Sequence, residues 1–184
     1  GSCAATLHYG EPFFSGLAGQ PEQVERFSRA MANLTDGIKA GAIAGYDFGG
    51  AGTIADIGAA DGAVVAEVVR NTPGTTGIVF DLPHVLIEAE AAIKGHDLGD
   101  RLTTEGGSFF ESVPSGADTY LLSLILHDWS DEEAATILRN VRDAAEPGAR
   151  VVALEFVMPT DDAPHMAKMI DLTMLGMLDG RERT

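Results

Sequence analysis

Short apolar runs alternate with helical spacing along most of the chain, and this alternation predicts the order of its elements. Strands are expected at 53–57, 77–80, 102–105, 119–126 and 150–157, of which the third is the weakest. The run 119–126 is apolar on both faces, which is typical of a strand in the middle of a parallel sheet. Five strands are therefore predicted, with the fourth inside the sheet.

Helical spacing fills the intervals between these strands. Residues 63–70 repeat valine at helical intervals, and 85–94 can form a second helix. Ser130 and Glu133 make a capping box at the start of a third helix over 131–146.

An amphipathic helix is also expected before the first strand, between Pro21 and the glycines at 41 and 45. Its apolar positions recur at three- and four-residue steps and are Val24, Phe27, Met31, Leu34 and Ile38. We therefore divide the chain into a helical lead-in segment, 1–45, and a core domain, 46–184.

Strands that alternate with helices across short connections predict an α/β fold, with a doubly wound, mostly parallel Rossmann-like sheet and helices on both faces. Ligands bind such sheets at the carboxyl ends of the strands. In this sequence those ends carry Gly58, Asp81, Ser108, His127 and Glu155. Polar or conformationally permissive residues thus lie where this fold places a site.

Charge and composition narrow the classes of function. The 28 acidic and 12 basic residues give a formal net charge of -16, which opposes binding to nucleic acid, and the scattered acids suit a solvated surface. We find no apolar run of the roughly 20 residues that a membrane helix needs, and no signal-peptide pattern. The only cysteine, Cys3, follows a Gly1-Ser2 start that resembles the remnant of a cleaved tag. No disulfide is expected within the chain, and a cytoplasmic location is predicted.

The turn after the first predicted strand reads Asp56-Ile57-Gly58-Ala59-Ala60-Asp61-Gly62. A dinucleotide-binding loop needs glycine at position 60, where the backbone approaches a pyrophosphate closely, and this chain has alanine there. S-adenosylmethionine has no pyrophosphate and requires only a tight turn against its methionine part. The loop therefore favours a nucleoside without phosphates, although a purely structural turn would also explain it.

Asp81 adds a second feature at a linked position. It ends the second predicted strand 23 residues after Gly58, where a carboxylate can accept hydrogen bonds from both ribose hydroxyls. The alternative is an exposed turn acid before Leu82-Pro83.

His127 follows the fourth predicted strand and is expected to project from the carboxyl edge rather than into the core. An imidazole with an ordinary pKa of about 6.5 can take a proton from a phenol, which creates the oxygen nucleophile for in-line attack on an electrophilic methyl group. Glu155, near the end of the fifth predicted strand, could orient the imidazole and favour its charged form. The alternatives are a hydrogen-bonded structural histidine and a solvated glutamate.

Several other residues allow two interpretations each. Asp128 could simply start the following helix, and Trp129 is expected to pack rather than to recognise a ligand. The last helical stretch carries four methionines, which either line a pocket for a flat aromatic ligand or pack in the core; they are Met166, Met169, Met174 and Met177.

Seven segments together resemble one family over nearly the whole chain. They are Tyr9-Gly10-Glu11-Pro12-Phe13-Phe14, Phe27-Ser28-Arg29-Ala30-Met31, Asp56-Ile57-Gly58, Phe80-Asp81-Leu82-Pro83-His84-Val85, Gly106-Gly107-Ser108-Phe109-Phe110, Leu126-His127-Asp128-Trp129-Ser130-Asp131-Glu132 and Gly180-Arg181-Glu182-Arg183-Thr184. In this order they resemble the S-adenosylmethionine-dependent O-methyltransferases of bacteria and plants, which include caffeate, hydroxyindole and polyketide-tailoring enzymes.

The resemblance implies a role for each matching position. Gly58 would border the cofactor, and Asp81 would hold its ribose. Ser108 and Phe109 would lie beside the adenine, and Ser123 is also assigned to the cofactor. His127 would be the general base, and the resemblance adds Glu182 to Glu155 as a second acid that flanks it. The acceptor substrate is assigned to Asp128, Met169 and Met174, and no metal is expected.

Two departures from the family pattern bear on function. The cofactor loop is usually Gly-Gly-Gly-x-Gly, and the residue beside the adenine is usually aspartate where this chain has Ser108, so weaker cofactor binding is expected.

Family members also carry an N-terminal winged-helix dimerisation domain and two further C-terminal strands. The sequence begins after the position of the winged-helix domain and stops before the position of the two C-terminal strands. We therefore expect a sheet without its last two strands, little cofactor binding or turnover by this chain alone, and a homodimer for the full-length protein.

The expected function is methyl transfer from S-adenosylmethionine to a hydroxyl of an aromatic small molecule of the natural-product type. One alternative is an enzyme that binds the same cofactor but hydroxylates or decarboxylates the aromatic substrate. Another is a non-catalytic cofactor-binding or assembly module. A nicotinamide-dependent dehydrogenase is disfavoured by Ala60.

Overall fold

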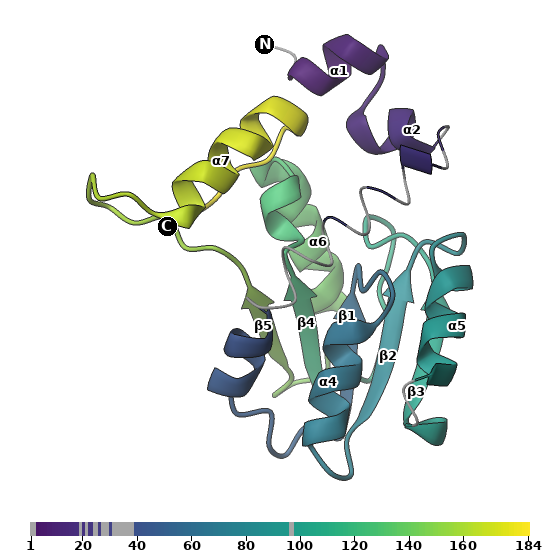
Figure 1. Cartoon of the computed structure of the whole chain (residues 1–184). Coiled ribbons are helices and arrows are strands. Elements are labelled where there is room, and N and C mark those ends of the chain that lie inside the picture. The colour runs from purple at the N-terminus through teal and green to yellow at the C-terminus, as the bar shows by residue number, and fades with distance from the viewer. Residues whose placement is uncertain are drawn as a thin grey trace.

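A five-stranded parallel sheet forms the centre of the molecule (Figure 1). The computed structural model describes residues 3–18, 20, 22–23, 26, 30, 39–95 and 98–184. The strands run in the order β3-β2-β1-β4-β5 and comprise β1 (Thr53–Ile57), β2 (Thr76–Asp81), β3 (Leu102–Gly106), β4 (Thr119–Ser123) and β5 (Arg150–Leu154). Neighbouring strands are parallel throughout, and the winding direction reverses between β1 and β4. Ligands bind doubly wound sheets at this reversal.

Helices cover both faces of the sheet, which confirms the predicted fold class. Helices α4 (Ala63–Asn71) and α5 (Leu86–Gly95) lie on one face together with the helical residues 39–45, and α6 (Asp131–Ala144) lies on the other (Figure 1). One apolar cluster joins the first group of helices to the sheet, and a second joins α6 to it. All five residues of β4 are buried, as a strand with neighbours on both sides and helices on both faces requires.

The remaining helices lie beyond the carboxyl edge of the sheet (Figure 1). They are α1 (Ala4–Tyr9), α2 (Phe13–Ala18) and α7 (Met166–Met177), and α1 packs against α7. Two 3-10 turns complete the described elements, η1 (Gly99–Arg101) and η2 (Leu126–Asp128). No helix in the described part of the chain combines the length and the apolar character needed to cross a membrane.

Two predicted strand ends are wrong by three residues each. The fourth strand was expected to reach Leu126 but ends at Ser123, because Leu124 has a φ of +55°, which an extended strand does not allow. The apolar run continues past this break into η2, so hydrophobicity alone could not show where the strand stops. The fifth strand ends at Leu154 rather than Val157, and Val157 instead forms an isolated bridge with Arg183.

The lead-in helix is seen only in part. Its predicted apolar positions Val24, Phe27, Met31, Leu34 and Ile38 lie outside the described residues. Residues 39–45 are helical, which agrees with the predicted end near the second glycine. The division into 1–45 and 46–184 stays a prediction.

Candidate functional site

The loop between β1 and α4 turns tightly at the reversal point of the sheet. Gly58, Ala60 and Gly62 all have positive φ, and the amide of Gly58 donates to the Phe80 carbonyl over 2.9 Å. A Cβ on Gly58 would lie 2.6 Å from Ile125 Cδ1, so this position needs glycine both for its conformation and for space. Ala60 adopts the left-handed conformation (φ +50°) without that freedom, at a cost in strain.

Asp81 connects this loop to the end of β2. Its Oδ2 accepts from the Ala60 amide over 2.9 Å and its Oδ1 from the Leu82 amide over 2.7 Å. Burial raises the pKa of the Asp81 carboxyl above its usual range, and these two amides oppose the rise. The side chain is therefore a half-buried, structurally held acid and not an exposed turn residue.

The residues assigned to the cofactor lie together at the carboxyl edge of the sheet, and their chemistry fits a nucleoside. Each Asp81 oxygen that accepts one amide keeps a second lone pair for a hydroxyl donor. Ser123, at the end of β4, is buried and its Oγ has no hydrogen-bond partner among the described residues. Ser108 and Phe109 follow β3 and are both half-buried. Hydroxyl-accepting and apolar groups are thus available together, as a nucleoside requires.

His127 lies in η2 and is more buried than the sequence led us to expect. Only 8% of the residue is exposed, because the C-terminal segment 180–184 covers it. A Cβ on Gly180 would lie 2.0 Å from the His127 carbonyl oxygen, so the close approach of this segment depends on glycine. His127 thus lies at the carboxyl edge, beyond β4, but the C-terminal segment covers it.

Glu182 is the direct partner of the imidazole. Its Oε1 lies 2.8 Å from His127 Nδ1, and the Glu182 side chain is completely buried. The backbone amide of Glu182 donates to Asp171 Oδ1 over 2.9 Å, which anchors the acid to α7. The second carboxylate oxygen of Glu182 has no partner in the described residues.

Glu155 is close to the imidazole but supports it indirectly. Its Oε1 accepts from the amides of Ile125 and Leu126 at 3.0 and 2.8 Å, so it holds the backbone that leads into η2. Burial raises the pKa of Glu155, while His127 and the two amides oppose the rise. Its Oε2 is buried without a partner among the described residues.

Asp128 faces the other side of the imidazole. Its Oδ1 lies 3.4 Å from His127 Nε2. Burial, with the negative charges of Glu155 and Glu182, raises the pKa of Asp128 to about 7, although His127 opposes the rise. The helix α6 is capped by Ser130, so Asp128 does not cap that helix.

Arg183 belongs to the C-terminal segment that resembles the family, and no role was predicted for it; the structure shows that it clamps η2. Its Nη1 donates to the Leu126 carbonyl over 2.6 Å and its Nη2 to the Trp129 carbonyl over 2.9 Å. Both Nη2 and Nε also reach Asp131 Oδ1. The only sequence signal for this clamp is that two cations flank the acid in Gly180–Thr184.

The residues assigned to the acceptor are not brought together on one surface. Met174 is buried, whereas Met169 on the same helix is 62% exposed. Trp129 packs edge-to-face on Phe110 with ring centroids 4.7 Å apart, and Phe109 and Phe14 border it. This aromatic cluster beside η2 offers an apolar surface, and the acceptor roles of Asp128, Met169 and Met174 stay predictions.

The three groups at the imidazole also have the composition of a metal site. His127, Glu155 and Glu182 each place one ligand atom within 4.8 Å of the others. Geometry therefore permits a divalent cation there, and the expected independence from metal requires a test.

Comparison with known proteins identifies the family. The model of the O-methyltransferase domain matches residues 3–184. Phenazine O-methyltransferase from Lysobacter antibioticus is 38% identical over 184 residues, covering all of this chain and 54% of that protein. Aclacinomycin 10-hydroxylase from Streptomyces purpurascens is 32% identical over 178 residues, covering 96% of this chain and 48% of that protein. The chain thus spans about half the length of the curated relatives it matches.

A solved structure supports the same assignment. The O-methyltransferase of neocarzinostatin biosynthesis, in complex with S-adenosyl-L-homocysteine and 1,4-dihydroxy-2-naphthoic acid, superimposes with a TM-score of 0.87 at 31% identity. The match covers 97% of this chain and 54% of that one. With the parallel sheet, the tight loop after β1 and the buried histidine–glutamate pair, these matches show that the chain belongs to the O-methyltransferase domain family.

Proposed function

We propose that this protein transfers a methyl group from S-adenosylmethionine to a hydroxyl of an aromatic small molecule, with His127 as the general base. The observation that carries the proposal is the 2.8 Å contact between His127 Nδ1 and Glu182 Oε1, made at the carboxyl edge of the sheet beside the cofactor loop. Family membership supports the reaction class, and the relatives' aromatic ligands support the substrate class.

Glu182 fixes the proton on the imidazole. A buried carboxylate accepts from Nδ1–H, so Nε2, which lies 3.4 Å from Asp128 Oδ1, keeps the lone pair that can take a proton from the acceptor hydroxyl. The same carboxylate stabilises the imidazolium once the proton has moved.

Glu155 acts as a positioning residue. It accepts from two consecutive backbone amides ahead of His127, so the turn that carries the base keeps its shape during proton transfer. Its negative charge adds to the stabilisation of the imidazolium.

When bound, S-adenosylmethionine supplies the electrophilic methyl group. Gly58 and Asp81 would hold its nucleoside at the loop and at β2, Ser108 and Phe109 would lie at the base, and Ser123 would be a further cofactor contact. No metal is required by this scheme. Activity should therefore survive dialysis against a chelator, and a loss that added Mg²⁺ or Zn²⁺ restores would contradict it.

The direct test replaces His127 with alanine in the full-length protein. Turnover of a phenol panel with isotopically labelled methyl donor should fall roughly 10²- to 10⁴-fold, the range of general-base catalysis. His8→Ala, an exposed histidine on α1, serves as the matched control and should leave turnover unchanged. Unchanged turnover in His127→Ala would remove the histidine as base.

A second candidate reaction is hydroxylation or decarboxylation of the aromatic substrate, because the relative aclacinomycin 10-hydroxylase carries a different activity by name. The mass of the product distinguishes methylation from the second candidate reaction. A net gain of CH2, from replacement of the hydroxyl hydrogen by a methyl group, supports methylation, and gain of one oxygen or loss of carbon dioxide supports the second candidate.

The homodimer is predicted for the full-length protein, and the cytoplasmic location stays a prediction. The resemblance supports dimerisation. Exposed apolar side chains on α7, among them Leu172 and Leu175, leave a surface that a second copy could cover. Sedimentation of the full-length protein at a mass of two chains is the expected result, and a monomer would contradict the proposal.

A further inference from the structure

Two buried carboxylate oxygens beside His127 have no hydrogen-bond partner among the described residues. They are Oε2 of Glu155 and Oε2 of Glu182. The Glu182 side chain is completely buried, and its other oxygen already contacts His127 Nδ1 over 2.8 Å. Native proteins rarely leave such groups unpaired, so these two oxygens have the capacity to bind one further group.

The charges around these oxygens indicate that the group is a cation. Neither glutamate forms a hydrogen bond or an ion pair with a lysine or arginine in the described part of the chain. Asp128 adds a third acid, 3.4 Å from the other ring nitrogen of His127. An anion would be repelled by these acids, and a buried carboxylate without a compensating charge is costly. A cation between the two glutamates compensates both charges.

The available ligand atoms indicate the class of cation. His127, Glu155 and Glu182 each place one ligand atom within 4.8 Å of the others, which gives one imidazole nitrogen and two carboxylate oxygens. Three protein ligands of these types with an open fourth position are typical of Zn²⁺. Mg²⁺ prefers oxygen ligands in octahedral geometry and keeps several of its waters. A metal site also needs an entry path, and Glu155 lines a cavity of about 150 Å³.

Asp128 supports the same arrangement from the second ring nitrogen. A histidine that binds a metal usually donates its other ring N–H to a carboxylate, carbonyl or water, which fixes the orientation of the ring. Glu182 faces Nδ1, and Asp128 Oδ1 faces Nε2 across 3.4 Å. An ion bound at Nδ1 would therefore find an acceptor for the Nε2 proton already in place.

This inference rests on the proposed function, because it concerns the imidazole assigned as the base. We propose that His127, Glu155 and Glu182 bind Zn²⁺ and that the bound ion inhibits methyl transfer. The ion takes the place of the proton on Nδ1, so the neutral imidazole carries its proton on Nε2. The Nε2 lone pair that accepts the proton of the acceptor hydroxyl is then lost. Zinc thus acts by changing which ring nitrogen bears the proton.

Zinc affinity is the first measurement, made on the full-length protein by competition with a chromophoric chelator. A single tight site per chain is expected, and millimolar Mg²⁺ should not displace Zn²⁺ from it. Glu155→Gln should raise the Kd for Zn²⁺ roughly 10- to 100-fold, and His127→Ala should raise it at least as much. Glutamine still offers an oxygen to the amides of Ile125 and Leu126, so η2 keeps its support in Glu155→Gln.

Two matched variants remove other zinc ligands of the chain. Cys3 is a free cysteine, and His84 is an exposed histidine. Cys3→Ser and His84→Ala should each leave the Kd for Zn²⁺ unchanged. The inference is wrong if either of these variants loses the tight site, or if Glu155→Gln and His127→Ala bind Zn²⁺ as tightly as the unaltered protein.

Turnover distinguishes this inference from the proposed function. Zn²⁺ at a concentration that fills the site should lower turnover roughly 10²- to 10⁴-fold, as loss of a general base does, and a chelator should restore it. If the protein has no tight zinc site but His127→Ala still slows metal-free turnover, the inference is wrong and the proposed base stands. If Zn²⁺ binds through Glu155 and His127 and turnover is unchanged, both the inhibition and the role of His127 as base are wrong.

Discussion

Asp56 is one of two acids, with Asp128, whose ionisation should strongly affect the stability of the free protein. It is 1% exposed, and burial raises the pKa of its carboxyl to about 7, with Lys39 and the Val65 amide opposing the rise. The folded pKa lies above the unfolded value near 4, so the folded state binds the extra proton between these two values. The contribution of Asp56 to stability is therefore fully present below pH 4 and is lost as pH rises from about 4 through about 7.

The substitution Asp56→Asn should remove the part of the pH dependence that Asp56 contributes. Each pKa unit corresponds to about 1.4 kcal/mol, so the full window is worth at most roughly 4 kcal/mol. The check is urea denaturation at pH 5 and pH 8, with the exposed Asp100→Asn as control. Equal losses of unfolding free energy between these pH values in Asp56→Asn and in the unaltered chain would contradict this role for Asp56.

Glu182 permits a second test at a single residue. Glu182→Gln keeps the shape of the side chain but removes the charge that faces His127 Nδ1. Loss of one charge-assisted hydrogen bond, about 1.5–3 kcal/mol, should lower kcat roughly 10- to 100-fold in the full-length protein. The Kd for S-adenosylhomocysteine should stay within about twofold, because this acid holds the base and not the cofactor. A change in that Kd with kcat intact would assign Glu182 to the cofactor site instead.

The individual site residues differ in how far sequence could place them. His127 and Asp81 follow strands of a parallel sheet, so topology alone brings them to one edge. Glu182 lies 55 residues from His127, and no periodicity relates the two, so only the family resemblance supplied it. Burial of His127 depends on the path of the chain after α7, which local pattern does not encode.

At the scale of elements, η2 carries the base and is held from two directions. Glu155, from the end of β5, accepts from its leading amides, while Arg183, from the C-terminal segment, donates to the carbonyls of Leu126 and Trp129. A planar guanidinium can reach two carbonyls and a carboxylate at once, whereas an ammonium group cannot reproduce this fork.

Arg183→Lys should therefore lower kcat about tenfold while the Kd for S-adenosylhomocysteine remains unchanged. Steady-state kinetics of the full-length protein combined with calorimetry would measure both. Arg142→Lys, which alters an exposed arginine paired with Asp143 on α6, is the matched control. If kcat is unaffected, the clamp contributes nothing to positioning the base.

The predicted ends of strands and helices were most accurate where a turn directly follows the element. The first strand was predicted with its observed bounds because Gly58 ends the apolar run at the turn itself. The fourth was overextended because Ile125 and Leu126, beyond the break at Leu124, are apolar for packing at the edge rather than for strand pairing. Helices α1 and α2 were not predicted, since six residues carry too little periodicity.

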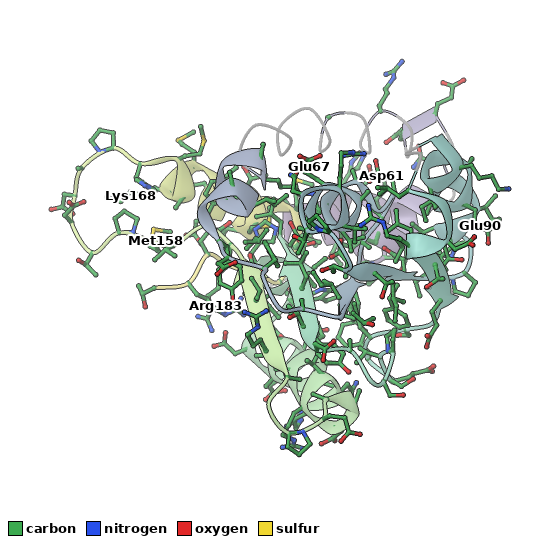
Figure 2. All side chains as sticks on the ribbon, turned by 90° about the horizontal axis from the view of Figure 1, so that it is seen from below. Asp61, Glu67, Glu90, Met158, Lys168 and Arg183 are labelled. Carbon is green, nitrogen blue, oxygen red and sulfur yellow. The ribbon has the colours of Figure 1, made fainter. Side chains whose placement is uncertain are left out.

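For the molecule as a whole, the net charge of -16 creates a general self-repulsion. Acids such as Asp61, Glu67 and Glu90 are spread over the side covered by α4 and α5 (Figure 2). The Debye length shortens from about 30 Å at 0.01 M salt to about 10 Å at 0.1 M, so salt should relieve repulsion between such separated charges.

Raising NaCl from 10 to 150 mM should consequently increase the Tm by a few degrees, since about 1 kcal/mol corresponds to roughly 2–4 °C in a chain of this size. Calorimetric scans at fixed pH would measure the shift. Glu90→Gln combined with Glu111→Gln removes two exposed charges, so this variant should melt higher at 10 mM NaCl and gain less from added salt. Salt also weakens specific ion pairs, such as Arg183–Asp131, and this weakening lowers the Tm. A Tm that falls with salt would mean that these pairs outweigh the general repulsion.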